Sequence, residues 1–446
     1  MFARIPPLEP FTSWIPLSVS WRKALLLRRH AVYEGIARLP CKSRQNPLRP
    51  FGLANAYPKR QSQSRILVIG CRFRLFWTIQ LRIQRVFKTS SCRAVDAIAA
   101  KCVSDSKTPG IAIGIMQNGK AVLEEGYGTA NLEHKVPAKP ETVFRIASIT
   151  KQFTATGILL LAEEHLLSTN DKLSRFFPEF PRSDEVTIRQ LLTHTSGLPS
   201  YDAKPEYRSF RLQSHTISEL VNWIKPDPYV AEPGAQYFYS NSGYLMLAGI
   251  IEKVSGRSFR DFLKVRVFDR LGLTSTQVAQ DDATLIPNRA AGYVFRDGQF
   301  RQFLNAPFSA ASNNSGGTSI VSTVGDLIRW HSALFGGVVL SPPVFQEMIS
   351  PGTLKNGERI VTPLSDGGYG YGLFLINFMG HQKIGHTGRS TTGFNSVAYT
   401  YPNERLTIAV FTNIAGEAPL QLLAMQVEEE IASLLLGSAP FNRSRV

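Results

Sequence analysis

The sequence predicts a mixed α/β (α+β) protein built on one antiparallel sheet, with strands contributed by both ends of the chain. Three observations support this prediction: a strand–turn–strand pattern near residue 118, a second one near residue 402, and a long, mostly helical stretch between them. Because strands from the two ends can pair while the intervening helices cover them, we expect helices on the sheet and a largely helical second lobe. A cleft between the lobes would be the natural place for a site.

The first strand pair follows a helix-like segment at Asp96–Val103. Isoleucines alternate with small residues through Ile111–Ile115, which is typical of a strand with one face toward a core. The Asn118–Gly119 pair that follows tolerates the positive φ angles of a tight turn. A hairpin over Gly110–Gly126 is therefore predicted.

The second strand pair lies near the other end of the chain. Two apolar strands are predicted at Phe394–Tyr401 and Leu406–Phe411, joined by a turn around Pro402–Glu404. A final helix is predicted over Pro419–Leu436, because it has a proline in its first turn and is followed by Gly437.

Helical patterns fill the middle of the chain at Val186–Thr193, Ile217–Trp223, Gly243–Val254 and Thr323–Phe335. A longer helix is predicted over Phe144–Leu167, and this segment is apolar on most of its circumference. A helix of that kind is buried on all sides. We therefore expect it at the centre of the fold.

The position of the charge decides what the formal net charge of +16 implies for this 446-residue chain. Residues 1–95 hold 18 Lys and Arg residues and two acidic ones, whereas the rest of the chain holds 32 of each sign. A neutral main body gives no reason to expect a nucleic-acid partner. No uncharged apolar run reaches the roughly 20 residues that a transmembrane helix needs, so none is expected.

The composition divides the chain into a basic extension at 1–95, a folded domain at 96–437 and a tail at 438–446. The extension is rich in Arg and poor in acids, which is typical of an organelle transit peptide but also follows from a start codon assigned too far upstream. We favour the second explanation and expect the mature protein to begin beyond residue 60. No secretory signal is recognisable, because the apolar segment Ile66–Gly70 is too short.

No cofactor or metal site is indicated. Neither metal-ligand spacing nor a disulfide framework is found at the four cysteines, Cys41, Cys71, Cys92 and Cys102. The segment Gly114–Lys120 has the spacing of a phosphate-binding loop, but Ala121 follows it where a hydroxyl is needed to hold Mg²⁺.

The strongest candidates for chemistry are Ser148 and Lys151, in the first turn of the long predicted helix. Residues three apart share a helix face, so the amine could remove the proton of the hydroxyl. The first N–H groups of a helix have no hydrogen-bond partner within the helix, so the N–H of Ser148 could bind a developing oxyanion. Lys151 must then be partly neutral, which burial would favour by lowering its pKa from about 10.4.

Each motif alone has a simpler interpretation. The Ser-x-x-Lys pattern also occurs at Ser20–Lys23 and Ser104–Lys107, and a helix cap beside a solvated lysine would explain it. A second motif, Tyr239-Ser240-Asn241, is matched by Tyr401-Pro-Asn403 as well, and alone its tyrosine could be a rim aromatic and its asparagine a helix cap. A third, His386-Thr387-Gly388, occurs once. His194 is interpreted as structural, holding a turn by hydrogen bonds. The order Ser148, Tyr239, His386 is far more specific than any one motif.

On these motifs the chain resembles the serine β-lactamase and penicillin-binding-protein-like family, closest to class C β-lactamases, D-alanyl-D-alanine carboxypeptidases and related esterases. The resemblance covers about Asp96–Leu436 and implies a β-lactamase/transpeptidase-like fold. It extends to Gly126-Tyr-Gly, Leu192–Pro199, Gly316-Gly317, Ser322-Thr323, Asp326 and Tyr369-Gly-Tyr-Gly372.

The resemblance implies a role for each motif residue. Ser148 would be the nucleophile and Lys151 its proton partner. Tyr239 would shuttle the proton to the leaving group. Asn241 would donate from its amide to the acyl side chain of the substrate. These roles agree with the needs of acylation: an activated hydroxyl, a proton for the departing group and donors for the oxyanion.

The resemblance also implies that His386, Thr387 and Gly388 line the site on a strand, with the backbone N–H of Arg389 as the second oxyanion donor. Two residues depart from the family pattern. Many β-lactamases have lysine where this chain has His386, and a histidine is mostly neutral at pH 7. A small residue is more usual at Arg389, whose cation could replace the missing lysine or obstruct the site.

Together these observations predict a serine hydrolase that forms a covalent acyl-enzyme without a cofactor. Its substrate would be a small molecule or peptide: an ester, a D-amino-acid peptide or a β-lactam. The alternative is a catalytically silent binding or scaffolding module with the same fold. The resemblance implies a periplasmic or extracellular protein, although no signal peptide is recognisable, and the oligomeric state is left open.

Overall fold

The computed structural model describes residues 91–279, 284–296, 302–310, 315–416 and 422–437. The predictions for the N-terminal extension up to residue 90 and for the tail at 438–446 lie outside the described residues. Within the described part of the chain, no helix is long and apolar enough to cross a membrane.

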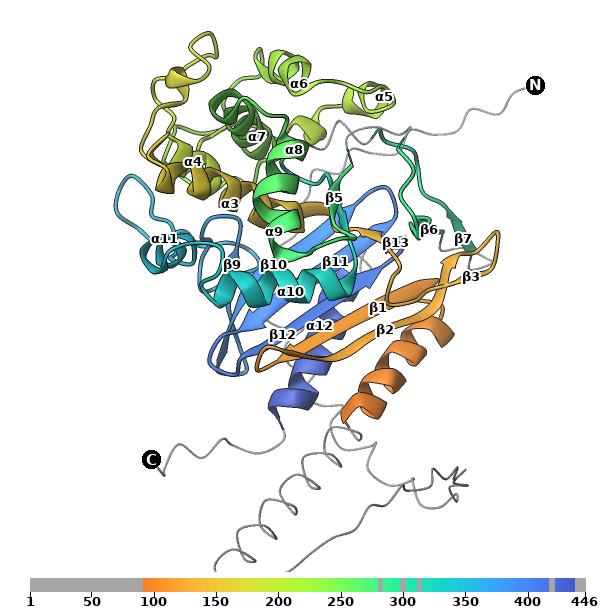
Figure 1. The fold of residues 1–446 in the computed structure, drawn as a ribbon. Helices are drawn as coiled ribbons and strands as arrows, with labels where there is room; N and C mark the ends of the chain where they lie inside the picture. The colour runs from red at the N-terminus through yellow and green to blue at the C-terminus, as the bar shows by residue number, and fades with distance from the viewer. Residues whose placement is uncertain (1–90, 280–283, 297–301, 311–314, 417–421, 438–446) are drawn as a thin grey trace, which may run out of the picture. The chain divides into compact units, whose positions relative to one another are not determined.

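A seven-stranded antiparallel sheet forms the base of the fold, in the order β3-β2-β1-β12-β11-β10-β9 (Figure 1). Strands from the two chain ends meet where β1 pairs with β12, so the predicted sheet built from both ends is confirmed. The strands are β1 (Gly110–Gln117), β2 (Lys120–Asn131), β3 (Val136–Pro137), β9 (Phe374–Phe378), β10 (His381–Ser390), β11 (Phe394–Tyr401) and β12 (Leu406–Thr412).

The predicted hairpin turn between β1 and β2 is confirmed. Asn118 has φ 51° and Gly119 has φ 72°, the positive values that a two-residue hairpin turn of this type needs. Strand β2 continues past the predicted end at Gly126, and its last residues pair with β3.

Each face of the sheet is covered by helices. The isoleucines of β1 belong to a core with the helix at 91–104 and with α12 (Leu423–Leu436). The opposite face carries small residues, which let α10 (Val324–Phe335) approach closely: a Cβ on Gly114 would lie 3.0 Å from Val324. The predicted start of the final helix at Pro419 lies outside the described residues.

Most of the chain between β3 and β9 forms the largely helical second lobe that was predicted, whereas α10 packs on the sheet (Figure 1). Four helices of this stretch match the predicted segments within about two residues. They are α4 (Ile188–Leu192), α6 (Ile217–Ile224), α7 (Asn241–Ser255) and α10. Apart from the central helix described below, the others are α5 (Tyr207–Phe210), α8 (Phe259–Leu263), η4 (Lys264–Phe268), α9 (Asp269–Leu271), α11 (Pro342–Met348) and the short turns η1 (Ala147–Ile149), η2 (Leu173–Arg175) and η3 (Tyr201–Ala203).

Two small three-stranded sheets complete the fold. One contains β4 (Phe144–Arg145), β8 (Ile320–Ser322) and β5 (Gln277–Val278), and the other contains β13 (Ile414–Ala415), β6 (Tyr293–Arg296) and β7 (Gln302–Asn305).

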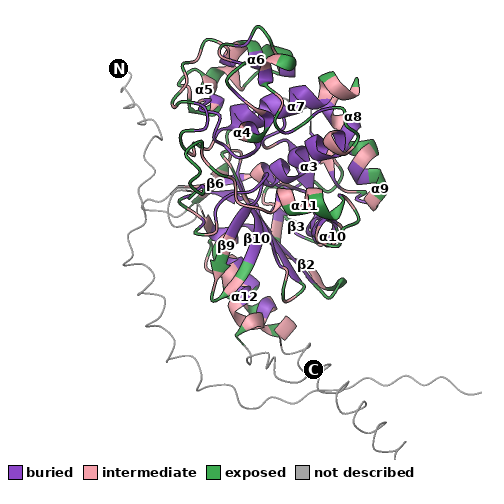
Figure 2. Ribbon diagram, turned by 90° about the vertical axis from the view of Figure 1, so that its left-hand side faces the viewer, coloured by how far each residue is buried: buried purple, intermediate pink, exposed green. Residues whose placement is uncertain are grey.

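The central helix is buried as predicted, but its predicted bounds were wrong. Helix α3 spans Thr150–Glu163, and its residues are buried from Thr150 to Leu161, as the purple ribbon at the centre of Figure 2 shows. The segment before it is not helical, because β4 pairs with β8. Ala147 then adopts φ 46° and starts the 3-10 turn η1 (Ala147–Ile149). Tertiary pairing here outweighs the helical pattern of the local sequence.

Candidate active site

Ser148 lies in η1, between β4 and the buried helix α3, and its side chain is half-buried. Strand β10 passes directly against this turn. A Cβ on Gly388 would lie 2.2 Å from the carbonyl oxygen of Ile146, so only glycine allows the approach. Ser396, on β11, fixes the same carbonyl by donating a hydrogen bond of 2.8 Å. The serine is therefore held on a tight turn at the surface of the sheet.

Lys151 is the residue that most clearly distinguishes this site from an ordinary helix start. Its side chain is fully buried. Its Nζ lies 3.2 Å from Ser148 Oγ, 2.7 Å from Asn241 Oδ1 and 3.1 Å from the carbonyl oxygen of Gly317. Burial lowers the pKa of Lys151 to about 7, and the charge of Asp202 opposes this change. The amine is thus available as a base near neutral pH.

The Gly316–Gly317 bend presents that carbonyl to Lys151. Gly316 has φ 75°, and a Cβ there would lie 2.1 Å from the carbonyl oxygen of Tyr244. The Thr154 hydroxyl donates to the Gly316 carbonyl at 2.7 Å, which ties the bend to α3. Both glycine carbonyls therefore face groups of the central helix.

Asn241 is the first residue of α7, and its amide links two charged groups. Its Oδ1 accepts from Lys151, while its Nδ2 donates to Asp202 Oδ2 at 2.9 Å. Asp202 also accepts from the Ser200 hydroxyl. One of the two Nδ2 hydrogens is thus directed to Asp202, and the carbonyl end of the amide faces the lysine.

Tyr239 stands in the irregular segment before α7 and is half-buried. Lys151 Nζ lies 4.8 Å from the centroid of its ring. Burial raises the pKa of the Tyr239 phenol, and a hydrogen bond with Ser148 partly offsets this effect. The phenol is therefore protonated at neutral pH and close to both Ser148 and Lys151.

His386 lies on β10 with its ring almost completely buried. Its Nε2 is 3.0 Å from the hydroxyl of Tyr369, and its Nδ1 contacts the carbonyl of Thr387. Burial, and to a smaller extent the charge of Lys151, lowers the pKa of His386 to about 3. The ring is thus neutral and supports the wall of the site, without a charge for a substrate carboxylate.

The remaining residues of the predicted strand motif follow along β10. Thr387 is half-buried, Gly388 is buried and Arg389 is exposed. Strand β9 pairs with β10 only as far as Gly385, so this stretch of β10 extends beyond the end of β9. The Arg389 N–H therefore belongs to the strand segment that runs beside η1, where an oxyanion donor is expected.

Two contributors were not recognised in the sequence. Asp202 follows the quoted Leu192–Pro199 motif by only three residues, but nothing local marks a carboxylate that reaches an asparagine 39 positions further along the chain. Tyr369 was part of a quoted motif, yet its hydrogen bond to His386 is a tertiary contact that no spacing rule gives.

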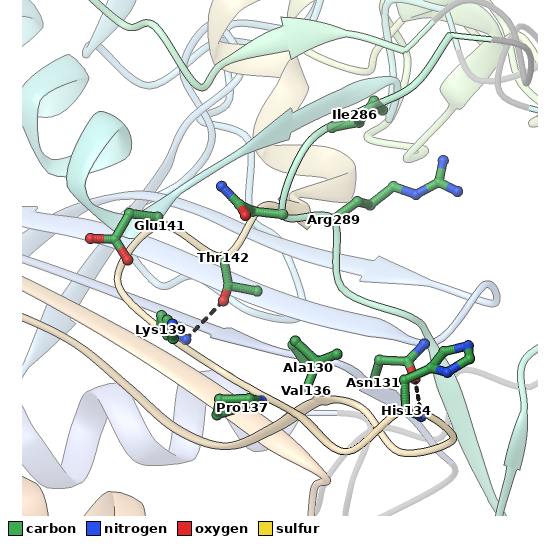
Figure 3. A pocket seen from close by; sticks show the side chains of 11 residues that line it. Ala130, Asn131, His134, Val136, Pro137, Lys139, Glu141, Thr142, Ile286 and Arg289 are labelled. Carbon is green, nitrogen blue, oxygen red and sulfur yellow. Dashed lines mark hydrogen bonds between the residues drawn. The ribbon is translucent and has the colours of Figure 1, made fainter.

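A separate hollow of about 610 Å³ lies beside β3, away from these residues (Figure 3). None of the predicted site residues lines it. Its lining consists of Ala130, Asn131, His134, Val136, Pro137, Lys139, Glu141, Thr142, Ile286, Asn288 and Arg289.

The fold is that of the serine hydrolases of the β-lactamase and penicillin-binding-protein superfamily. A family profile described as Beta-lactamase matches residues 95–431, and the chain belongs to this family. The chain is similar to "Penicillin-binding protein 4*" of Bacillus subtilis (strain 168), with 31% identity over 332 residues that cover 71% of this chain and 70% of that protein.

Three other similar proteins have lower sequence identity to this chain. The human "Serine beta-lactamase-like protein LACTB, mitochondrial" is 28% identical over 318 residues, which span 55% of this chain and only 57% of that protein. An octameric penicillin-binding protein homologue from Pyrococcus abyssi superimposes with a TM-score of 0.67 at 28% identity, over 79% of this chain and 78% of that one. The D-amino acid amidase from Ochrobactrum anthropi SV3, complexed with D-phenylalanine, has the same fold, with a TM-score of 0.70 at 24% identity over 78% and 100% of the two chains.

Proposed function

We propose that this chain hydrolyses an ester or amide through an acyl-enzyme on Ser148. The observation that carries the proposal is the fully buried amine of Lys151, 3.2 Å from the Ser148 hydroxyl. A solvated lysine at a helix start would keep its ordinary, high pKa. A buried lysine with a pKa of about 7 can remove a proton at neutral pH.

The two neighbours of Ser148 take different roles because burial shifts their pKa values in opposite directions. Lys151 loses its proton near pH 7 and acts as the base, whereas the Tyr239 phenol keeps its proton and acts as the shuttle. During acylation, Ser148 Oγ bonds to the substrate carbonyl carbon and its proton passes to Lys151. Tyr239 then relays a proton to the leaving oxygen or nitrogen as the carbonyl–leaving-group bond breaks.

The oxyanion of the tetrahedral intermediate is bound by the N–H groups of Ser148 and Arg389 in this proposal. Water then attacks the acyl carbon, the product acid leaves, and Ser148 regains its proton. Asn241 and the Gly317 carbonyl accept hydrogen bonds from the Lys151 ammonium that forms in the first step. No step requires a cofactor.

Esters and peptide-like amides fit the site better than β-lactams. The neutral, buried ring of His386 offers no charge to the carboxylate that β-lactams carry. Its Nδ1 proton is donated to the Thr387 carbonyl, and its Nε2 electron pair accepts from the Tyr369 hydroxyl. One protein with the same fold is named as a D-amino acid amidase, which is in keeping with the amide class.

A labelling experiment tests the proposal. The protein is incubated with a fluorophosphonate and, separately, with a fluorescent penicillin, and the adduct is located by mass spectrometry. We expect fluorophosphonate on Ser148, no labelling of Ser148→Ala, and hydrolysis of p-nitrophenyl esters or D-alanine p-nitroanilide. If neither probe labels the protein and none of these substrates is cleaved, the hydrolase proposal is wrong and a silent binding module is the better explanation.

A further inference from the structure

His194 is a buried residue of the Leu192–Pro199 motif that the proposed chemistry does not use. It follows helix α4, has φ 59° and is 1% exposed. Three consecutive residues of the segment before α7 contact it. Its carbonyl accepts from the Phe238 N–H at 2.8 Å, its Nδ1 accepts from the Ser240 N–H at 3.1 Å, and its ring lies 4.2 Å from that of Tyr239.

These contacts fix one tautomer of the imidazole. Because Nδ1 accepts a hydrogen bond from a backbone N–H, the proton of the neutral ring must lie on Nε2. Burial keeps His194 neutral by lowering its pKa well below the ordinary value. Within the described chain Nε2 has no hydrogen-bond partner, and the ring is enclosed by the rings of Tyr244 and Tyr369, each at 5.0 Å.

The segment that carries Tyr239 needs such support because residues 237–240 belong to no helix or strand. Tyr239 therefore lacks the backbone ladder that holds Gly388 or the helix that holds Lys151. The hydrogen bonds that His194 accepts, one at its main-chain carbonyl and one at Nδ1, fix the backbone on either side of Tyr239, and the ring contact fixes the tilt of the phenol. Misplacing a catalytic group by about 1 Å can cost about 100-fold in rate.

We infer that His194 is a positioning residue that holds the Tyr239 phenol against Ser148 for proton delivery to the leaving group. This inference rests on the proposed function and adds to it. It assigns no proton transfer to His194 itself. Its consequence is selective: only substrates whose leaving group must be protonated depend on a correctly placed phenol.

The experiment compares two esters of the same acid. A p-nitrophenolate departs without a proton, whereas an alkoxide requires one. For His194→Asn, we expect kcat/KM for the alkyl ester to fall about 100-fold and that for the p-nitrophenyl ester to fall less than about 10-fold. Asparagine tolerates a positive φ, as position 194 requires, and its side-chain oxygen keeps an acceptor near the place of Nδ1, so this variant tests the ring contact with Tyr239. His194→Gln serves in its place should the shorter variant fail to fold.

His331 provides a matched control on α10. It is also fully buried, its Nδ1 is 2.9 Å from the Thr400 hydroxyl, its Nε2 has no hydrogen-bond partner among the described residues, and burial lowers its pKa to about 3. His331→Asn should lower the thermal stability and leave the ratio of the two ester rates unchanged. In a Tyr239→Phe background, His194→Asn should no longer change that ratio, because the group it positions is gone.

This design distinguishes a failure of the inference about His194 from a failure of the proposed function. If the wild type and His331→Asn hydrolyse both esters but His194→Asn lowers both rates equally, His194 has only a structural role and the inference is wrong. A persistent effect in the Tyr239→Phe background overturns it as well. If the wild type itself neither cleaves an ester nor forms an adduct, the proposed function fails, and the inference falls with it.

Discussion

Lowering the pH from 8 to 5 should remove the neutral amine of Lys151 on which the proposed acylation depends. Burial places the pKa of this group at about 7, compared with about 10.4 for a solvated lysine. The neutral fraction is then about 90% at pH 8, about 50% at pH 7, about 9% at pH 6 and about 1% at pH 5. A solvated lysine would be only about 0.04% neutral at pH 7.

The assay is the second-order rate constant for labelling of Ser148 by a fluorophosphonate between pH 5 and 9 at constant ionic strength. Fluoride departs without a proton, so the rate reports the base and not the Tyr239 shuttle. On logarithmic axes the rate should rise with a slope of one up to about pH 7 and then level off. Samples returned from pH 5 to pH 8 should recover the full rate, which excludes irreversible unfolding as the cause.

Lys151→Arg supplies the control, because arginine keeps a positive charge throughout this range and cannot act as a base. We expect this variant to lose labelling at every pH. The reasoning is refuted if the wild-type midpoint lies above pH 9, or if Lys151→Arg retains the wild-type profile. The first result would mean that burial does not lower the lysine pKa, and the second that another group removes the proton.

Three further changes test other parts of the structure. Asp202→Asn removes a charge that raises the pKa of Lys151 but keeps an oxygen for the amide of Asn241. The pH midpoint of labelling should therefore move to lower pH, with a roughly twofold higher rate at pH 6. An unchanged or higher midpoint would contradict this. Gly388→Ala places a Cβ 2.2 Å from a backbone carbonyl and from a serine hydroxyl, so labelling should fall at least about 100-fold, and a rate within threefold of wild type would show that the turn can move away. Lys383→Met leaves the carboxylate of Glu428 buried without its cation at 2.8 Å, which should cost about 3–5 kcal/mol of unfolding free energy in urea titrations. Adding Glu428→Gln should recover part of that loss, and no recovery would mean that the two residues do not act as a pair.

Local sequence signals predicted most of the fold because each belongs to a short segment. The Asn118–Gly119 pair marks a hairpin by its own conformational freedom, and the positive φ angles of both residues confirm it. The start of α3 could not be predicted in this way. Strand β4 pairs with residues about 177 positions away in the sequence, and no local pattern contains that information.

For the site, too, the sequence indicated which residues take part but not which atoms contact one another. Their spacing pointed to Ser148 and Lys151, and the resemblance to the family pointed to Tyr239 and Asn241. The structure brings Ser148, Tyr239 and Asn241 around Lys151. The direction of the Asn241 amide depends on Asp202, a partner from a different element. Motifs therefore predict which side chains meet, whereas the fold decides which atom of each side chain faces the other.

The surroundings of Lys151 are arranged for the charge that appears during the proposed reaction and not for the charge of the resting state. Burial favours the neutral amine before the reaction, since a buried ammonium is costly. Once the amine takes the Ser148 proton, its new charge meets two fixed acceptors, Asn241 Oδ1 at 2.7 Å and the Gly317 carbonyl at 3.1 Å. Contacts that strengthen only as charge develops lower the barrier, because they stabilise the transition state more than the ground state.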